Sequence, residues 1–280
     1  MNDFVTKKAH DLPQLTVAGH LYEVEAILFD KDGTLIDFIH TWGRWGELLC
    51  THFSEELKKR NLPPFEEGFL QKWGIDYDEN GAITDYDRNG PLSMGTVDEL
   101  LSLLAWEGYR KGLSWAEAKV LAHSSRIHAD RSLEASRTAK LMPDVLQFLE
   151  QCRSSGIVMG VVTADETEAA EKHLEWLGIR DYFAVCIGAD QVTQGKPYPE
   201  MVEKACRQLL VSCSRTAVIG DTKGDMLMAR SAGSAVAIGI SIPSKFGGAG
   251  LAEADYVISS YRELAVQKMG REGNHDSRYF

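Results

Sequence analysis

Six polar side chains in this 280-residue chain stand at or shortly after apolar runs, and their types suit the handling of phosphate. They are Asp30, Asp32, Thr163, Lys196, Asp221 and Asp225. Carboxylates without histidine or cysteine form a hard oxygen site, which favours Mg²⁺. A hydroxyl and an ammonium beside such a site would hold phosphate oxygens. The residue types therefore predict magnesium-assisted chemistry on a phosphate group.

The spacing of Asp30 and Asp32 suggests a division of labour. One carboxylate can attack phosphorus while the other transfers protons. Gly33 follows directly and permits a sharp turn, so that nearby backbone amides can point at an anion. Taken singly, a strand-terminal aspartate is often only a helix cap, and a lysine is usually a solvated charge. The combination is informative because the residues come from separate loops.

The elements that carry these residues alternate between strand and helix. We expect buried strands over 25–30, 157–163, 182–189, 216–221, 235–240 and 255–260. Helices are expected between them over 144–155, 166–179, 199–210 and 225–233. This alternation predicts an α/β fold, a doubly wound parallel sheet of Rossmann-like type. Ligands of such sheets bind beyond the carboxyl ends of the strands, where the six side chains would meet.

The region 38–137 has a different pattern and predicts an inserted, mainly helical cap. Apolar residues recur at helical spacing from Trp42 to Leu57. Thr96 and Ser114 each precede a glutamate by three residues, which predicts two helix starts. Five of the six tryptophans lie in this region, and we expect most of them in its core. The catalytic core would comprise 24–37 and 138–280, after a leader, 1–23, with a short strand or hairpin arm within 15–22.

The ordered motifs resemble those of the haloacid dehalogenase (HAD) superfamily, in particular its phosphoglycolate-phosphatase-like members. The segment 30–34 (DKDGT) matches the first motif of the family, and Thr163 in VVTAD matches the second. Lys196 in GKPYP matches the third, and Asp221 with Asp225 matches the fourth. The segment 254–264 is similar to the last strand and helix of the family. The resemblance covers residues 24–264, with the cap matched only by position and helical character.

The resemblance implies a role for each motif residue. Asp30 would be the nucleophile that forms an aspartyl-phosphate, and it would also bind Mg²⁺. Asp32 would be the general acid and base, and its backbone carbonyl would bind the metal. Thr163 and Lys196 would bind the phosphoryl group, and Lys196 would also offset the charge of Asp30. Asp221 would bind the metal, while Asp225 would support the metal shell or Lys196.

The substrate implied by the resemblance is a small phosphorylated metabolite, cleaved as a phosphate monoester. Asp32 is intact, which favours phosphate chemistry because haloacid dehalogenases lack this aspartate. A sugar phosphomutase of the β-phosphoglucomutase kind keeps the same pair and remains an alternative, as does a catalytically silent HAD-like binding protein. In the cap, Arg44 and Lys111 are candidate substrate contacts with surface charge as the default. Trp42 or Trp45 could face the site, with the cap core as the default.

The segment 76–87 resembles a calcium-binding loop, with the pattern D-x-D-x-N-G and an acid at position twelve. The twelfth residue is Asp87 instead of the usual bidentate glutamate, and Asn89, Gly90 and Pro91 follow where a helix should start. We therefore favour a β-hairpin around a Glu-Asn-Gly turn.

Composition narrows the class of protein. The formal net charge is −11, which disfavours binding to nucleic acid or to an anionic membrane surface. Five cysteines without a C-x-x-C pair argue against a zinc ribbon or a disulfide scaffold. The chain shows no signal-peptide pattern and no membrane-spanning run, so we expect a cytoplasmic enzyme with reduced thiols. Its oligomeric state cannot be read from the sequence.

Overall fold

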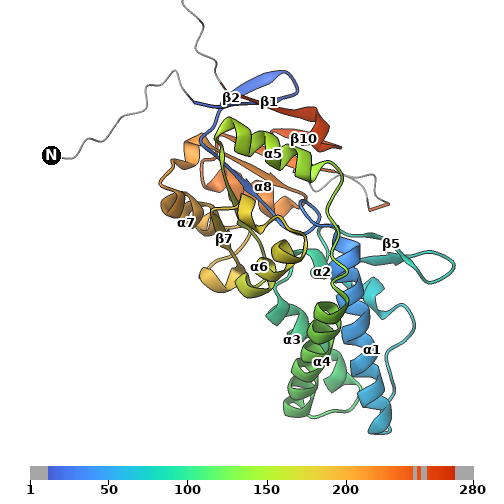
Figure 1. Cartoon of the computed structure of the whole chain (residues 1–280). Coiled ribbons are helices and arrows are strands. Elements are labelled where there is room, and N and C mark those ends of the chain that lie inside the picture. The colour runs from blue at the N-terminus through green and yellow to red at the C-terminus, as the bar shows by residue number, and fades with distance from the viewer. Residues whose placement is uncertain (1–11, 242–244, 247–250, 269–280) are drawn as a thin grey trace, which may run out of the picture.

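The computed structural model of the protein describes residues 12–241, 245–246 and 251–268. The first eleven residues of the predicted leader and the last twelve of the predicted core lie outside the described residues. Figure 1 shows a sheet with helices on both of its faces, and beside it a group of helices that includes α1, α3 and α4. Among the described residues, no helix combines the length and the apolar character that crossing a bilayer requires.

The central sheet has six parallel strands in the order β10-β9-β8-β3-β6-β7. They are β3 (Ala26–Phe29), β6 (Val158–Val162), β7 (Val185–Ile187), β8 (Thr216–Gly220), β9 (Val236–Ile240) and β10 (Tyr256–Ile258). Each falls within one of the six predicted strands. The first strand, β3, lies in the interior of the sheet between β8 and β6, so its carboxyl end is flanked by two other strand ends.

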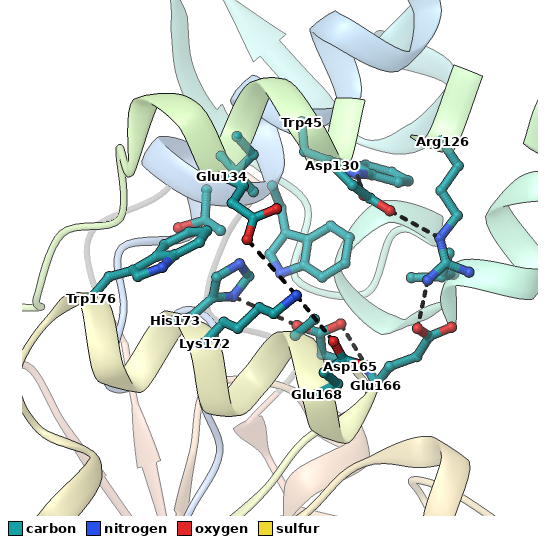
Figure 2. A pocket seen from close by; sticks show the side chains of 15 residues that line it. Trp45, Arg126, Asp130, Glu134, Asp165, Glu166, Glu168, Lys172, His173 and Trp176 are labelled. Carbon is teal, nitrogen blue, oxygen red and sulfur yellow. Dashed lines mark hydrogen bonds and ion pairs between the residues drawn. The ribbon is translucent and has the colours of Figure 1, made fainter. Parts of the chain in front are cut away.

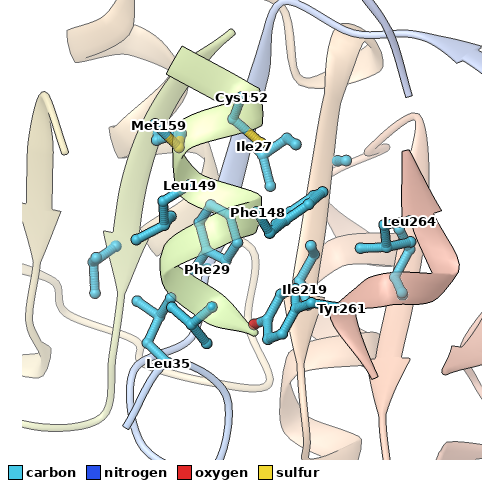
Figure 3. Packing of buried hydrophobic residues seen from close by; sticks show 14 of the residues in the cluster. Ile27, Phe29, Leu35, Phe148, Leu149, Cys152, Met159, Ile219, Tyr261 and Leu264 are labelled. Atoms are coloured by element: carbon cyan, nitrogen blue, oxygen red, sulfur yellow. The ribbon is translucent and has the colours of Figure 1, made fainter. Parts of the chain in front are cut away.

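Helices cover both faces of this sheet, as the alternating pattern predicts. They are α5 (Val145–Ser155), α6 (Thr167–Trp176), α7 (Glu200–Leu209) and α8 (Lys223–Ser231). Ile27 and Phe29 of β3 pack in the cluster that contains α5 and α6, while Leu28 packs with α7 and α8 on the other face. Figure 3 shows the first cluster, in which the rings of Phe29 and Phe148 meet edge to face. The doubly wound α/β fold is therefore confirmed.

A small antiparallel sheet of order β11-β1-β2 adjoins α5. Its strands are β1 (Gln14–Val17), β2 (His20–Glu23) and β11 (Leu264–Gln267). The predicted hairpin arm is formed by β1 and β2, whose turn residues Ala18 and Gly19 both have positive φ. The helix implied after the last parallel strand is wrong. Only one 3₁₀ turn, Tyr261–Glu263, forms there, because the following segment pairs with β1 and buries Leu264.

The inserted region is mainly helical and contains one hairpin. Its helices are α1 (Arg44–Lys59), α2 (Pro91–Met94), α3 (Val97–Arg110) and α4 (Trp115–Ser136), and its strands are β4 (Ile75–Tyr77) and β5 (Ile83–Tyr86). Both predicted capping boxes form, at Thr96 and at Ser114. We refer to residues 38–137 as the cap.

The tryptophans of the cap divide between its core and its surface. Trp45 and Trp73 are buried, and Trp42 is half-buried against the same cluster. Trp106 and Trp115 are 52% and 44% exposed, so three of the five tryptophans contribute to the core, as expected for most of them. Both exposed tryptophans lie on the outer side of helices whose inner stripe of leucine and alanine already fills the core.

Candidate active site

The predicted site residues meet at the carboxyl edge of the parallel sheet. Asp30 follows β3, Thr163 follows β6 and Asp221 follows β8, and these three strands are neighbours in the sheet. Lys196 lies in the loop between β7 and α7, and Asp225 lies in the first turn of α8. The topology of the sheet thus brings together residues that are up to 195 positions apart in the chain.

Three buried carboxylates and one ammonium form the centre of this site. Asp30, Asp221 and Asp225 each offer an oxygen, and these oxygens lie within 4.8 Å of one another. Lys196 Nζ binds Asp30 Oδ1 and lies 2.6 Å from Asp225 Oδ1. Asp225 also closes a capping box with Thr222, which fixes its carboxylate at the start of α8. We call Asp30, Asp221 and Asp225 the carboxylate cluster.

The carboxylate cluster carries more negative charge than its surroundings balance. Burial raises the pKa of Asp30 well above its usual value, against the opposing effect of Lys196. Burial and the adjacent Asp225 raise the pKa of Asp221 to about 7. Burial alone would lower the pKa of Lys196, but Asp225 and Asp30 raise it above its ordinary value. The cluster therefore has room for further positive charge.

A divalent cation fits this arrangement. The donor atoms are carboxylate oxygens, which are the ligands that Mg²⁺ prefers. Three carboxylates against one ammonium leave a negative excess that a bound cation would compensate. The side chain that was expected to support the metal shell, Asp225, contributes to the cluster directly and also binds Lys196.

Gly33 is required by the close approach of two other groups. Its φ is +82°, and a Cβ atom at this position would lie 2.2 Å from Asp221 Oδ2 and 2.6 Å from the hydroxyl of Tyr86. Thr34 Oγ1 donates a hydrogen bond to Asp221 Oδ1 at 3.5 Å. The turn after Asp30 therefore also positions the carboxylate of Asp221, through the space at Gly33 and the hydrogen bond from Thr34.

Tyr86 is a site residue that the sequence did not reveal. It comes from β5 of the cap, and its hydroxyl donates to Asp221 Oδ2 at 2.9 Å. Its ring stacks on Phe38 with centroids 4.0 Å apart, and the guanidinium carbon of Arg88 lies 4.3 Å from the centroid of the Tyr86 ring. A hairpin prediction alone could not show that one of its tyrosines reaches the sheet edge.

Asp32 lies outside the carboxylate cluster and faces a different set of partners. Its carboxylate binds Lys31 Nζ at 2.7 Å, and Lys31 is fully buried. The same ammonium contacts Asp165 Oδ2 at 3.1 Å and His173 Nδ1 at 3.1 Å. Lys31, within the segment DKDGT, is a second site residue that the sequence did not reveal. A lysine between two aspartates at a strand end was the available signal.

Thr163, Arg44 and Lys111 each have a partner within the protein. Thr163 is buried, and its Oγ1 accepts a hydrogen bond from the backbone N–H of Asp165 at 3.1 Å. Arg44 is exposed and pairs with Glu47, as the surface-charge interpretation expects. Lys111 Nζ donates to the carbonyl of Pro64 at 2.7 Å within the cap.

The calcium-like segment forms the favoured hairpin, with β4 and β5 antiparallel. Asp78 Oδ1 accepts the backbone N–H groups of Asn80 and Ala82 and thereby shapes the turn. Asp76 Oδ2 lies 2.6 Å from Lys245 Nζ. Within the described part of the chain, the group of acidic side chains close enough to share a cation is the carboxylate cluster instead.

Comparison with known proteins decides the family. The model of the haloacid dehalogenase-like hydrolases matches residues 24–233. The chain belongs to the haloacid dehalogenase-like hydrolases. This hydrolase is 30% identical over 211 residues to a Clostridium perfringens protein named "Putative pyrophosphatase PpaX", covering 75% of this chain and 81% of that protein. The predicted family is therefore confirmed.

Two further matches, one in sequence and one in structure, extend over most of the chain. A phosphoglycolate phosphatase of Yersinia pseudotuberculosis is 25% identical to this hydrolase over 245 residues, which are 86% of this chain and 91% of the relative. The crystal structure of a predicted phosphoglycolate phosphatase from Haemophilus somnus matches with a TM-score of 0.63 and 21% identity. That match covers 85% of this chain and 95% of the other, and shows that the fold is shared.

Proposed function

We propose that this hydrolase is a magnesium-dependent phosphatase that cleaves a small-molecule phosphate monoester through an aspartyl-phosphate. The observation that carries the proposal is the carboxylate cluster with Lys196 bound to Asp30 and Asp225 at the carboxyl edge of the sheet. The names of the two curated relatives support phosphate chemistry. The activity is phosphoglycolate-phosphatase-like in kind, and the substrate is a small phosphorylated metabolite.

The reaction has two steps on Asp30. In the first, a carboxylate oxygen of Asp30 attacks phosphorus, the bond from phosphorus to the ester oxygen breaks, and Asp32 gives its proton to the departing alcohol. In the second, Asp32 takes a proton from water as the water oxygen attacks phosphorus. The bond from phosphorus to Asp30 then breaks, which releases inorganic phosphate and restores the carboxylate.

The phosphoryl oxygens need donors throughout both steps. Thr163 supplies a hydroxyl and Lys196 supplies an ammonium, which also reduces the repulsion between Asp30 and the phosphate. Asp30 and Asp221 would hold Mg²⁺ together with the backbone carbonyl of Asp32. When bound, the metal supplies positive charge that stabilises the charge developing on the phosphoryl group. Asp225 keeps Lys196 in place, and Gly33 leaves space for Asp221.

The domain organisation supports a small substrate. We propose that residues 24–37 and 138–280 form the catalytic core and that the cap, 38–137, covers the site during turnover. Tyr86 reaches Asp221 from the cap, so the cap already lies over the carboxylate cluster in this structure. A macromolecule would not fit beneath a cap in this position. The enzyme would act in the cytoplasm.

The test is hydrolysis of p-nitrophenyl phosphate with and without Mg²⁺, in the wild-type protein and in Asp30→Asn. We expect turnover that needs the metal and falls at least about a thousandfold in the variant, as losses of catalytic groups do. Rapid acid quenching should trap a phosphoryl-enzyme in the wild type only. Activity that survives complete chelation, or equal activity in the two proteins, would exclude the proposal. Incubation with a sugar bisphosphate separates a mutase, which yields an isomer, from a phosphatase, which releases phosphate.

A further inference from the structure

A cavity lies between the cap and the core, and its lining is linked to the motif residues that follow β3 and β6. Its volume is about 200 Å³, and its walls come from α1 and α4 of the cap and from α6 of the core (Figure 2). Two lining residues, Asp165 and His173, both contact Lys31 Nζ, which binds Asp32. The backbone N–H of Asp165 also binds Thr163 Oγ1. The proposed acid, Asp32, is therefore linked to the cavity through Lys31, and the hydroxyl of Thr163 is linked to it through the backbone of Asp165.

Three indole rings line this cavity. Trp42 and Trp45 meet edge to face with centroids 5.1 Å apart, and the ring of Trp176 lies 4.9 Å from that of His173. Trp45 Nε1 donates to Asp130 Oδ1 at 2.7 Å, which fixes both side chains. Indole faces carry partial negative charge and attract cations within about 6 Å. The ammonium of Lys31, which binds the lining residue Asp165, lies 5.9 Å from the Trp42 ring and shows this interaction.

The charged residues of the cavity are mostly acidic. Five carboxylates line it, from Asp130, Glu134, Asp165, Glu166 and Glu168. Three cations face them: Arg126 and Lys172 in the lining, and Lys31, which binds Asp165. His173 is neutral because burial and nearby lysines lower its pKa to about 2. The cavity therefore carries a negative excess.

Both lining cations are already engaged by carboxylates. Arg126 binds Glu166 at 2.5 Å and Asp130 at 3.2 Å. Lys172 binds Glu168 at 3.0 Å and lies 3.9 Å from Glu134. An anionic group in the cavity would have to compete with these carboxylates for the cations, and all five carboxylates would repel it. A cationic group would meet aromatic faces and carboxylate oxygens instead.

We propose that this cavity binds the alcohol part of the substrate and selects a positively charged amino group in it. The preferred substrate is thus the phosphate monoester of an amino alcohol, and a carboxylate-bearing ester such as 2-phosphoglycolate is disfavoured. The inference rests on the proposed function and adds the substrate class. The proposed substrate class differs from 2-phosphoglycolate, which the name of the Yersinia pseudotuberculosis relative suggests.

The test compares three phosphate esters of similar length. O-Phosphoethanolamine carries an ammonium, 2-hydroxyethyl phosphate is neutral at this end, and 2-phosphoglycolate carries a carboxylate. We expect kcat/KM to fall in that order, with a roughly two- to thirtyfold advantage of the ammonium over the hydroxyl, the range that a cation–π contact gives. Equal or better use of 2-phosphoglycolate would overturn the inference.

Variants locate the preference in the cavity. Glu134→Gln and Trp42→Leu should reduce the ratio of kcat/KM for O-phosphoethanolamine over 2-hydroxyethyl phosphate. Glu55→Gln removes a carboxylate from an exposed position of α1 outside the cavity and should leave the ratio unchanged. A ratio that is unaffected in both cavity variants, or equally reduced in Glu55→Gln, would place the selection elsewhere and refute the assignment.

A binding measurement separates this inference from the proposed function. Choline is titrated into the Asp30→Asn protein, and tryptophan fluorescence is followed, with glycolate as the matched anion. We expect a saturable change with choline that Trp42→Leu reduces, and none with glycolate. Choline binding without hydrolysis of any phosphate would keep the cavity assignment and exclude the phosphatase. Hydrolysis of p-nitrophenyl phosphate without choline binding or amino-alcohol preference would do the reverse.

Discussion

The hydroxyl of Tyr86, carried by the cap, donates a hydrogen bond to Asp221 Oδ2 of the core at 2.9 Å. This contact joins the β4–β5 hairpin to the carboxylate cluster. Tyr86 is almost fully buried there, and burial together with Asp221 raises its pKa well above the usual value, so the phenol keeps its proton. The hydroxyl is therefore a permanent donor to an oxygen that the proposed metal would also use.

Removal of this hydroxyl should strengthen metal binding. In Tyr86→Phe, Asp221 Oδ2 loses a competing donor, and a hydrogen bond to a charged group is worth about 1.5–3 kcal/mol. Part of that is regained elsewhere, so we expect Mg²⁺ to bind roughly three- to tenfold more tightly in calorimetric titration. Tyr77→Phe, on the other strand of the hairpin, is the control. Weaker binding in Tyr86→Phe would mean that the hydroxyl orients Asp221 for the metal.

The meeting of the site residues at one edge of the sheet could be predicted because these residues have fixed places relative to the strands. Apolar runs identified the six parallel strands, and topology then placed Asp30, Thr163 and Asp221 on one edge. Lys196 and Asp225 followed from their position in the loops beside that edge. These inferences needed only local patterns and a rule for parallel sheets.

The contacts that cross between the cap and the core could not be predicted. Tyr86 approaches Asp221 across 135 residues of sequence, and no local pattern specifies how the hairpin is oriented. The engagement of Lys31 with Asp32 and Asp165 depends on rotamers inside a buried network. The helix expected at the end of 254–264 is only a 3₁₀ turn, because the chain continues into β11, whose pairing with the distant strand β1 leaves no local pattern.

A methyl group at Gly33 should damage both stability and the metal site. Gly19 and Gly33 have φ values of +78° and +82°, but a Cβ at Gly19 would have no neighbour within 4 Å. Gly19→Ala should therefore cost only the left-handed backbone penalty, about 1–2 kcal/mol in urea unfolding. Gly33→Ala should cost roughly 1–3 kcal/mol more because Asp221 and Tyr86 must move. Equal losses in the two variants would show that the Gly33 turn relaxes without disturbing Asp221.

Substitution of Asp32 should depend on the leaving group. A sugar or alkyl alkoxide needs a proton as it leaves, whereas nitrophenolate leaves well without one. Asp32→Asn should therefore lose roughly a hundred- to ten-thousandfold with an alkyl phosphate and far less with p-nitrophenyl phosphate in the first step. The aryl substrate should give a burst of nitrophenolate and then a slow steady state. Equal losses without a burst would assign Asp32 to shaping the turn around Gly33.

His173 should make the protein less stable in mild acid. It faces Lys31 and Asp165, with Lys172 on its own helix, and burial and the lysines lower its pKa from 6.5 to about 2. The unfolded chain binds a proton below pH 6.5 while the folded protein does not, so stability falls as the pH decreases below 6.5. The loss should reach about 2 kcal/mol between pH 6.5 and pH 5.

His173→Asn isolates this contribution, because its side-chain oxygen can still accept a hydrogen bond from Lys31. Asp165 acts in the opposite direction, since burial raises its pKa to about 6 and its ionisation destabilises the fold as the pH rises. Asp165 is present in both proteins, so the difference between their urea-unfolding free energies reports on His173. We expect the wild type to lose about 2 kcal/mol more than the variant from pH 6.5 to pH 5. His123→Asn, at an exposed position of α4, should follow the wild type. Parallel curves for all three proteins would mean that His173 is protonated in the folded state and that Lys31 has moved away from it.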